Sequence, residues 1–343
     1  MALGDRHASL GGKGVAIRGI AHRLGSRKVT NQDIIDEHRI RLKDAWVREN
    51  IGISERHWVG PHESTATMAA EVCAELVGNA GLAPAAVDRL IVATVSPEVI
   101  TPSTACITQS IFAPGTAFPC MDLVAACGGF LYALDVGRRC VQTGDRNVLV
   151  VASEVRSAFL DKQDRRTVML FGDGAAGVLL TPAREGEVGI VDTRLFADGR
   201  FWEAISVPAG GVRRPASAET VAEKAHSITM KDGAAIFERA VAEMTELVKA
   251  MVLGHGATLD EVDFFVFHQA SVNIVRRVLE ALGIPEEKTW INFPRVGNCT
   301  AASVPIALSE AVRAGRVKRG DLVCSVATGG GFTAGTALFR WEV

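Results

Sequence analysis

The segment Gly81-Leu-Ala-Pro-Ala-Ala-Val87-Asp88-Arg-Leu-Ile-Val92 has a second copy 175 residues further along the chain. The second copy reads Gly256-Ala-Thr-Leu-Asp-Glu-Val262-Asp263-Phe-Phe-Val-Phe267, and both copies end in a continuous apolar run. The apolar run Val148–Ala152 is matched in the same way by Leu322–Ala327. Apolar runs of this kind are typical of strands covered by helices on both faces. The sequence therefore predicts a duplicated α/β unit, with chance similarity between two βα units as the alternative.

The duplication predicts an N-terminal half over residues 1–185 and a C-terminal half over residues 186–343. Charge and composition exclude several classes of function. The net charge of −2 offers no general basic surface for nucleic acid, and no stretch is apolar enough to span a membrane. The first residues lack the apolar core of a signal peptide. Seven scattered cysteines without a CxxC pair favour a reducing cytoplasm and argue against a zinc site.

Cys127 stands where an apolar, small-residue run changes into a helical pattern, in Asp122-Leu-Val-Ala-Ala-Cys127-Gly-Gly-Phe-Leu-Tyr-Ala-Leu134. A thiol at a helix N-terminus faces unpaired N–H groups and the positive end of the helix dipole, which favour the thiolate. The small neighbours leave room for a bulky acyl group. The residue types thus indicate a nucleophile, although a buried structural cysteine is the alternative.

Three further elements point to the same place. An offset of 174 carries Cys127 to Ala301, three residues after Asn298, so the two helix starts are equivalent and converge if the halves face each other. His268 follows the run Phe264–Phe267, at the carboxyl end of a predicted strand, where α/β sheets bind ligands. A histidine that satisfies a loop carbonyl is the alternative. The glycine run 329–331 could aim backbone N–H groups at an oxyanion.

In combination these motifs resemble β-ketoacyl-acyl-carrier-protein synthase III, a branch of the thiolase-like condensing enzymes. The resemblance runs from about Gly14 to the C-terminus and implies a five-layered αβαβα duplication that is usually a homodimer. The motifs that carry it are Gly52-Ile-Ser-Glu-Arg-His57, Ala125-Ala-Cys127-Gly-Gly-Phe130, Phe171-Gly-Asp-Gly-Ala175, His268-Gln-Ala270, Gly297-Asn298, Ala301-Ala-Ser-Val-Pro305 and Gly329-Gly-Gly-Phe-Thr333.

The resemblance implies a catalytic triad of Cys127, His268 and Asn298. Cys127 would take an acyl group from a thioester, with backbone N–H groups of Cys127 and Gly330 as the oxyanion hole. A malonyl thioester would then lose CO₂, and neutral His268 and the Asn298 amide would donate hydrogen bonds to the enolate. This chemistry needs no metal and no redox cofactor.

The resemblance also places substrate-binding residues. Trp46 and Arg165 match the pair that sandwiches the adenine of coenzyme A, and Ala270, Asn273 and Phe237 would bind the substrate or the carrier arm. Arg276 and Arg277, in a predicted helix over 272–282, would dock an acyl carrier protein. Two family arginines are replaced by Asn50 and Asn273, and a phenylalanine that closes the acyl pocket aligns near Thr101.

The missing arginines favour an acyl carrier protein over acyl-CoA as the acyl donor, in fatty acid or specialised polyketide biosynthesis. We expect a cytoplasmic homodimer with the Val148–Ala152 strand near its interface. An acyltransferase that passes the acyl group to an alcohol or amine, and a non-decarboxylating condensation of two acyl chains, are the alternatives on the same scaffold. A catalytically dead subunit is disfavoured because Cys127 is present. The segment Phe171-Gly-Asp-Gly is interpreted as a structural turn beside the site.

Overall fold

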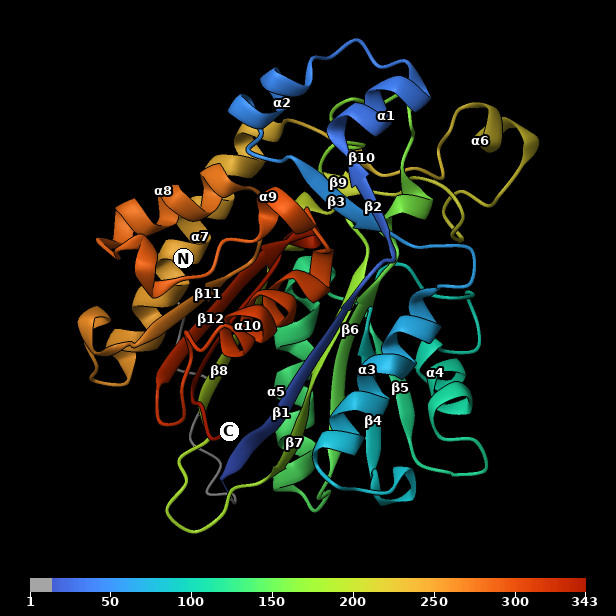
Figure 1. Cartoon of the computed structure of the whole chain (residues 1–343). Helices are drawn as coiled ribbons and strands as arrows, with labels where there is room; N and C mark the ends of the chain where they lie inside the picture. The colour runs from blue at the N-terminus through green and yellow to red at the C-terminus, as the bar shows by residue number, and fades with distance from the viewer. Residues whose placement is uncertain (1–13) are drawn as a thin grey trace.

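The computed structural model describes residues 14–343, in which two large β-sheets and three helical layers are stacked as αβαβα (Figure 1). The first sheet has the strand order β1 (Val15–Leu24), β7 (Gly174–Pro182), β6 (Val148–Glu154), β4 (Arg89–Ala93) and β5 (Cys120–Leu123). The second has the order β11 (Phe264–Phe267), β12 (Leu322–Gly329), β13 (Thr333–Arg340) and β8 (Ile190–Ala197).

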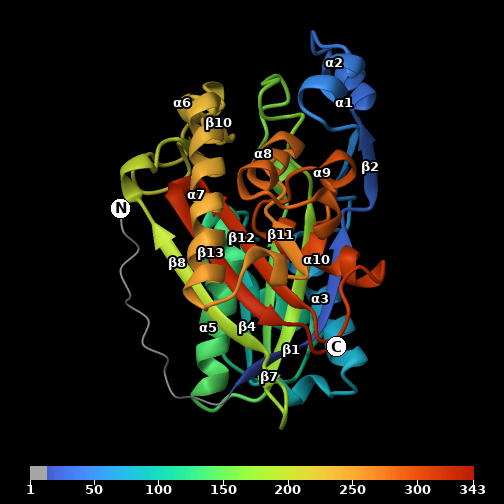
Figure 2. The ribbon, with the colours of Figure 1, turned by 90° about the vertical axis from the view of Figure 1, so that its left-hand side faces the viewer.

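Helices cover both faces of each sheet. The outer face of the first sheet carries α3 (Thr65–Asn79) and α4 (Thr104–Phe112), and that of the second carries α7 (Gly233–Gly254) and α8 (Val272–Leu282). Figure 2 looks onto α7 and α8 with the second sheet behind them. Between the sheets lie α5 (Gly129–Gln142) and α10 (Ser303–Arg313), whose apolar residues join both sheets in one core. Burial on two faces explains the continuous apolar runs of the strands.

The duplication predicted from the sequence is confirmed. The order β1-β7-β6-β4 in the first sheet repeats as β8-β13-β12-β11 in the second. The second half lacks a counterpart of the fifth strand, where a single bridge joins Phe265 to Thr289. The expected division between residues 185 and 186 falls in the connection between β7 and β8. The five-layered architecture is the one that the resemblance implied.

Helix α8 shows how local signals fix the elements. Ser271 caps the helix by accepting a hydrogen bond from the N–H of Ile274, and Gly283 ends it in the left-handed conformation with φ 66°. One face of the helix is buried and the other is exposed. The observed bounds are those predicted, residues 272–282.

The Val148–Ala152 strand, expected near a subunit interface, does not lie at the edge of its sheet. This strand, β6, is hydrogen-bonded on both sides, to β4 and to β7, and every residue of it is buried. A strand inside a sheet has no free edge to offer a partner. The open edge of the first sheet is β5, all of whose residues are half-buried.

Short elements gather beyond the carboxyl ends of the parallel strands, at the top of Figure 1. They are β2 (Arg27–Thr30), α1 (Asn31–His38), α2 (Asp44–Asn50), β3 (Glu55–Trp58), β9 (Ile205–Ser206), α6 (Ala218–Ala222), β10 (Thr229–Met230) and α9 (Phe293–Val296). Their apolar residues form a separate core with Phe171 and Val272. No helix within residues 14–343 is long and apolar enough to cross a membrane.

Candidate active site

Cys127 lies in a single 3-10 turn, Ala126–Gly128, that connects β5 to the buried helix α5. The residue before it, Ala126, has φ 44°, and Thr300 has φ 49° at the equivalent place before α10. Positive φ is uncommon outside glycine and costs about 1–3 kcal/mol, so surrounding structure must hold both residues. The two strained residues are 174 positions apart, which is the offset found between the repeats.

The two helix starts meet, as the duplication predicted. A Cβ placed on Gly129 would lie only 3.2 Å from the Cβ of Ala301. Small residues at both positions therefore allow the N-termini of α5 and α10 to approach each other closely. This contact brings the Cys127 turn beside the segment that contains Asn298.

The glycine run contacts Cys127 directly. A Cβ on Gly329 would lie 2.5 Å from the backbone nitrogen of Cys127 and 2.9 Å from its Cβ. Gly329 has an extended backbone with φ −153°, so closeness rather than backbone angle requires glycine here. The backbone N–H groups of Gly330 and Cys127 both lie close enough to the Cys127 sulfur to lower its pKa. These are the two N–H groups that the resemblance assigned to an oxyanion hole, and that role stays a prediction.

The free protein does not hold the Cys127 thiolate that the helix start predicted. Burial, with the nearby Glu154 carboxylate, raises the pKa of the Cys127 thiol to about 12. Arg156 and the two backbone N–H groups act in the opposite direction. Desolvation of the charged form outweighs these favourable interactions. The resting side chain is therefore a thiol, and it must lose its proton as it attacks.

His268 follows β11 and is 1% exposed. Its backbone N–H donates to the carbonyl of Val326 at 2.9 Å. Burial lowers the pKa of the imidazole to about 3, so the ring is neutral near pH 7. Its Nδ1 is buried and has no hydrogen-bond partner among the described residues. A neutral imidazole carries one N–H group, which can donate a hydrogen bond to an enolate.

The neighbouring Gln269 holds this histidine to the Asn298 side of the site. Its Nε2 donates to the carbonyls of Phe267 and Trp290 at 2.9 and 3.2 Å, and its Oε1 accepts from the N–H of Asn292 at 3.1 Å. Gln269 is completely buried. Its side chain thus fixes the end of β11 against the segment that leads to Asn298.

Asn298 is fixed with its amide donors free. Its backbone N–H donates to Leu170 at 2.8 Å, and its carbonyl accepts from Gly172 at 3.2 Å. Its Oδ1 accepts from the N–H of Thr300 at 2.8 Å, while its Nδ2 has no protein partner among the described residues. A Cβ on Gly172 would lie 2.2 Å from the carbonyl oxygen of Val296. The segment interpreted as a structural turn packs directly against Asn298: Phe171 forms a single parallel bridge with Asn298, and β7 begins at Gly174.

A cavity of about 440 Å³ opens above Cys127. Asn298, Gly330 and Arg156 border it together with the cysteine, whereas His268 lies outside its lining. The remaining lining residues are Val95, Val124, Ala125, Ala126, Phe171, Trp202, Ile205, Ser206, Val207, Ile228, Thr300, Gly331 and Thr333. The walls are thus mainly apolar, with a few polar groups near the sulfur, as in many small-molecule sites.

Sequence reasoning missed two charged residues at this site. Glu154 ends β6, is completely buried, and has its pKa raised to about 7 by burial. Its carboxylate accepts from the hydroxyl of Ser96 at 2.6 Å and the N–H of Val95 at 3.2 Å. Arg156 follows two residues later and is 6% exposed. The sequence does carry a signal for both residues: a glutamate and an arginine follow closely after a wholly apolar run, at the carboxyl end of the strand.

Trp46 and Arg165 line one hollow of about 720 Å³, as the resemblance implied. Arg41 and Lys43 line it too, and neither they nor Arg165 make an ion pair within the described residues. Sequence reasoning missed these two cations. Asn50 is adjacent, because its Nδ2 donates to the carbonyl of Trp46 at 2.9 Å. Its own backbone carbonyl accepts a hydrogen bond from the side chain of Asn273 at 3.2 Å.

The structure places other sequence-predicted residues away from the cavity. Arg276 pairs with Glu286 at 3.0 Å and Arg277 with Glu280 at 2.7 Å, all on the exposed surface. Phe237, on α7, packs against the core between α7, α8 and the second sheet, and lines neither the Cys127 cavity nor the Trp46 hollow.

Ala270 is half-buried against that same core, two residues after His268. Thr101 is exposed in the loop before α4. Within residues 14–343, no group of three or more His, Cys, Asp or Glu side chains is arranged to hold a metal ion.

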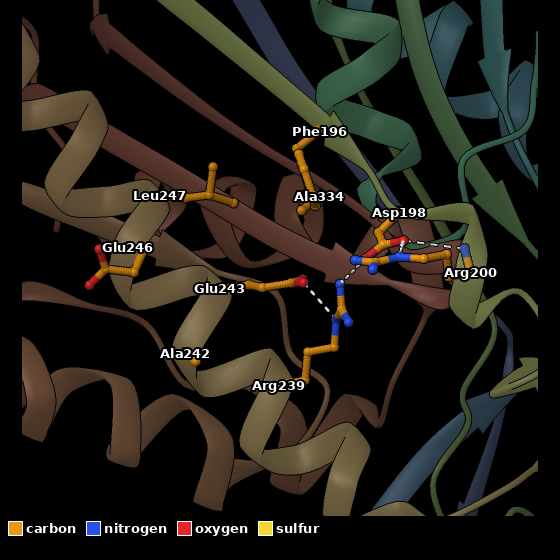
Figure 3. A pocket seen from close by; sticks show the side chains of 9 residues that line it. All are labelled: Phe196, Asp198, Arg200, Arg239, Ala242, Glu243, Glu246, Leu247 and Ala334. Atoms are coloured by element: carbon orange, nitrogen blue, oxygen red, sulfur yellow. Dashed lines mark hydrogen bonds and ion pairs between the residues drawn. The ribbon is translucent and has the colours of Figure 1, made fainter. Parts of the chain in front are cut away.

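A second cavity, of about 380 Å³, lies between α7 and the ends of β8 and β13 (Figure 3). Four of its charged groups are paired with one another: Arg239 binds Asp198 at 3.0 Å and Glu243 at 2.7 Å, and Arg200 binds Asp198 at 2.7 Å. The Arg239 guanidinium also lies 4.7 Å from the ring centre of Phe332. Asp198 and Phe332 exchange backbone hydrogen bonds of 2.8 and 3.0 Å. This cluster therefore braces the Gly330–Phe332 turn that presents a donor to Cys127.

Comparison with known proteins agrees with this geometry. Residues 121–199 match the family described as 3-oxoacyl-[acyl-carrier-protein (ACP)] synthase III, and residues 254–341 match its C-terminal part. A β-ketoacyl-[acyl-carrier-protein] synthase III of Chlorobaculum tepidum is 37% identical over 330 residues, which cover 95% of this chain and 99% of the relative. The chain belongs to the β-ketoacyl-[acyl-carrier-protein] synthase III family.

Solved structures of this family share the fold. The 3-oxoacyl-[acyl-carrier-protein] synthase III of Aquifex aeolicus VF5 superposes with a TM-score of 0.86 at 35% identity, covering 96% of this chain and all of that one. The priming β-ketosynthase of the R1128 polyketide pathway gives a TM-score of 0.85 at 27% identity, over 96% of this chain and 97% of that one. Members of this family are condensing enzymes that transfer acyl groups.

Proposed function

We propose that this protein is a decarboxylative condensing enzyme in which Cys127 carries the acyl group. The convergence of the two helix starts is the observation that carries the proposal, because it puts a thiol, backbone donors and a free amide at one cavity. Cys127 attacks an acyl thioester, its sulfur forms the new thioester bond, and its proton leaves with the departing thiol. The N–H groups of Cys127 and Gly330 stabilise the oxyanion of this step.

His268 and Asn298 act in the second step. A malonyl-type thioester loses CO₂, and the negative charge moves to the thioester oxygen. The neutral imidazole and the free Nδ2 of Asn298 donate hydrogen bonds to that oxygen, which lowers the barrier. The enolate carbon then attacks the acyl-cysteine and releases a β-keto thioester. All these groups belong to the chain itself, so we propose that no metal or redox cofactor takes part.

Intact-protein mass spectrometry tests the assignment. Wild-type protein incubated with an acyl thioester should gain the mass of one acyl group, and Cys127→Ala should gain none. His268→Ala and Asn298→Ala should lose malonyl decarboxylation by roughly 10²-fold or more while keeping part of the acylation. Acylation of Cys127→Ala, or undiminished decarboxylation in both other variants, would refute the roles assigned here.

The acyl donor is proposed to be an acyl carrier protein, with acyl-CoA as the weaker alternative. Asn50 and Asn273 remove two charged contacts for CoA phosphates. Arg276 and Arg277, which would dock the carrier protein, are exposed and each forms an ion pair with a neighbouring glutamate. Arg41 and Lys43 partly offset this loss, because both face the hollow beside Trp46 without an ion pair among the described residues.

Comparison of acylation rates from matched acyl carrier protein and acyl-CoA donors tests the preference. The wild type should favour the carrier, and Asn50→Arg with Asn273→Arg should improve acyl-CoA use selectively. Arg41→Ala should slow acylation from acyl-CoA. Equal use of both donors, unchanged by these substitutions, would refute the preference.

A cytoplasmic homodimer is part of the same proposal. The open edge strand β5 supports it, together with exposed Val99, Ile100 and Val124 in the loops nearby. Light scattering at micromolar concentration should give twice the chain mass of 36.4 kDa. A monomer would argue against the dimer without affecting the chemistry assigned to Cys127.

A further inference from the structure

Arg156 is a buried cation in the wall of the Cys127 cavity that the chemistry above does not use. It lies just beyond the end of β6, in the short turn Arg156–Phe159. Its Nη1 donates to the carbonyl of Val95 at 3.1 Å, whereas its Nε is buried with no hydrogen-bond partner within residues 14–343. An arginine is charged at any physiological pH, so the interior holds an incompletely bonded positive charge.

No carboxylate among the described residues forms an ion pair with Arg156. Burial lowers the pKa of Arg156, and the acidic side chains of Glu154 and Asp173 act in the opposite direction. The Glu154 carboxylate already accepts hydrogen bonds from Ser96 and Val95. The Asp173 carboxylate accepts hydrogen bonds of 2.9 Å or less from the N–H of Val59 and from the N–H and hydroxyl of Ser157. Burying an unpaired charge is costly, so a guanidinium in this position fits an anion supplied by the ligand.

Aromatic rings hold the guanidinium in place. Its central carbon lies 5.4 Å from the ring centre of Phe159 and 5.9 Å from that of Phe171, which itself lines the cavity. These contacts pre-orient the planar fork that matches a carboxylate. The rest of the wall is largely apolar and suits a hydrocarbon chain between the cysteine and the cation.

We propose that Arg156 determines the specificity of acylation by binding the terminal carboxylate of a short ω-carboxyacyl thioester, whose thioester carbon is attacked by Cys127. The inference rests on the acyl-enzyme function proposed above. In the step, the Cys127 sulfur forms a bond to the acyl carbon, the carrier's sulfur leaves, and the thiol proton goes with it. The distal carboxylate keeps its charge throughout and serves only for binding.

A malonyl carboxylate is a less suitable ligand for Arg156. That carboxylate must lose its charge as CO₂ departs, and a cation bound to it would stabilise the ground state more than the transition state. A purely electrostatic role toward the Cys127 thiolate is the other alternative. Such a role would affect acylation by every thioester alike, whereas binding of a terminal carboxylate distinguishes charged from neutral chains.

Matched pairs of thioesters on one carrier test the proposal: succinyl against butyryl, and glutaryl against pentanoyl. Single-turnover acylation of Cys127 is followed by intact mass. The wild type should load the carboxylated member of at least one pair at least tenfold faster. Arg156→Leu should abolish that preference and retain neutral acylation, and Arg156→Lys should keep part of it. Arg165→Leu, which removes a cation from the Trp46 hollow, should leave the ratio unchanged.

Preference of the wild type for the neutral member of both pairs would overturn the proposal. An equal loss of both substrates in folded Arg156→Leu would overturn it too, in favour of the thiolate role. A second measurement needs neither acylation nor an altered Arg156: glutarate, but not pentanoate, should raise the melting temperature of Cys127→Ala. No shift with glutarate would contradict carboxylate binding. Absence of acylation by every thioester would instead refute the function proposed above.

Discussion

The close approach of Gly329 to Cys127 makes Gly329→Ala the sharpest test of the site. The new Cβ would lie 2.5 Å from the Cys127 nitrogen, about 0.9 Å inside ordinary contact at 3.4 Å. Both atoms belong to rigid parts of the structure, so either the Cys127 turn or the Gly330 turn must move by close to that amount. Overpacking of this kind costs about 1–3 kcal/mol of stability.

The loss of activity should be much larger than the loss of stability. A misplacement of about 1 Å can cost about 10²-fold, and loss of one oxyanion donor about 10²–10³-fold. We therefore expect acylation of Cys127 to slow by about 10²–10³-fold, measured by single-turnover mass spectrometry. The melting temperature should fall by only a few degrees, since about 1 kcal/mol shifts large domains by about 2–4 °C.

Gly128→Ala is the matched control. It adds the same methyl group next to Cys127, but the nearest atom is the Thr333 hydroxyl at 3.4 Å and the backbone φ of −74° suits any residue. This variant should acylate within a few-fold of the wild type. If Gly329→Ala acylates as well as Gly128→Ala, the backbone of Gly329–Gly330 does not set the geometry at the sulfur, and the reasoning fails.

Three further predictions concern charge and burial. Because burial raises the pKa of Cys127 to about 12, the rate of its alkylation by iodoacetamide should rise about tenfold per pH unit from about pH 7 to 10. Peptide mass spectrometry measures this rate, and a plateau below about pH 9 would contradict the prediction. Burial raises the pKa of Glu154 to about 7 in the folded protein, so between about pH 4.5 and 7 the folded chain keeps a proton that the unfolded chain has released. The free energy of unfolding should therefore fall by up to about 3 kcal/mol as the pH rises through this range. Urea unfolding should show that Glu154→Gln lacks this fall, and an identical pH dependence in both proteins would count against it. Arg56 is completely buried and donates hydrogen bonds to Val29, Asn31 and Met169. Arg56→Ala should therefore lower the free energy of unfolding, measured with urea, by about 3–5 kcal/mol. A loss under about 1 kcal/mol would show that these contacts are replaceable.

The edge of the first sheet shows what an apolar pattern cannot reveal. The apolar run Val148–Ala152, together with the family resemblance, led to the expectation that this strand lies near a subunit interface. Its neighbours β4 and β7 cover both of its edges, and only the strand order reveals this. Apolar character reports burial of side chains, whereas an interface along a sheet depends on which backbone edge is unpaired.

The state of Cys127 shows a second limit. The helix start was visible in the sequence and correctly indicated backbone donors at the sulfur. The net pKa depends on how much water the surrounding residues exclude and on Glu154, Arg156 and Gly330, which come from distant parts of the chain. Desolvation is a property of the assembled surroundings, so no local pattern could give its size.

The sequence by itself determined the duplicated α/β architecture, the helix over residues 272–282, the placing of Cys127 and Asn298 at equivalent helix starts, and that of His268 at the end of a strand. These follow from local physics: apolar periodicity, helix caps, and the internal repeat. Only the tertiary structure decided that β5 is the open edge, that Arg41 and Lys43 border the Trp46 hollow, and that Arg156 lies unpaired in the wall of the Cys127 cavity. Each of these depends on which distant segments share a surface, and pairing and desolvation are fixed only when the segments have packed together.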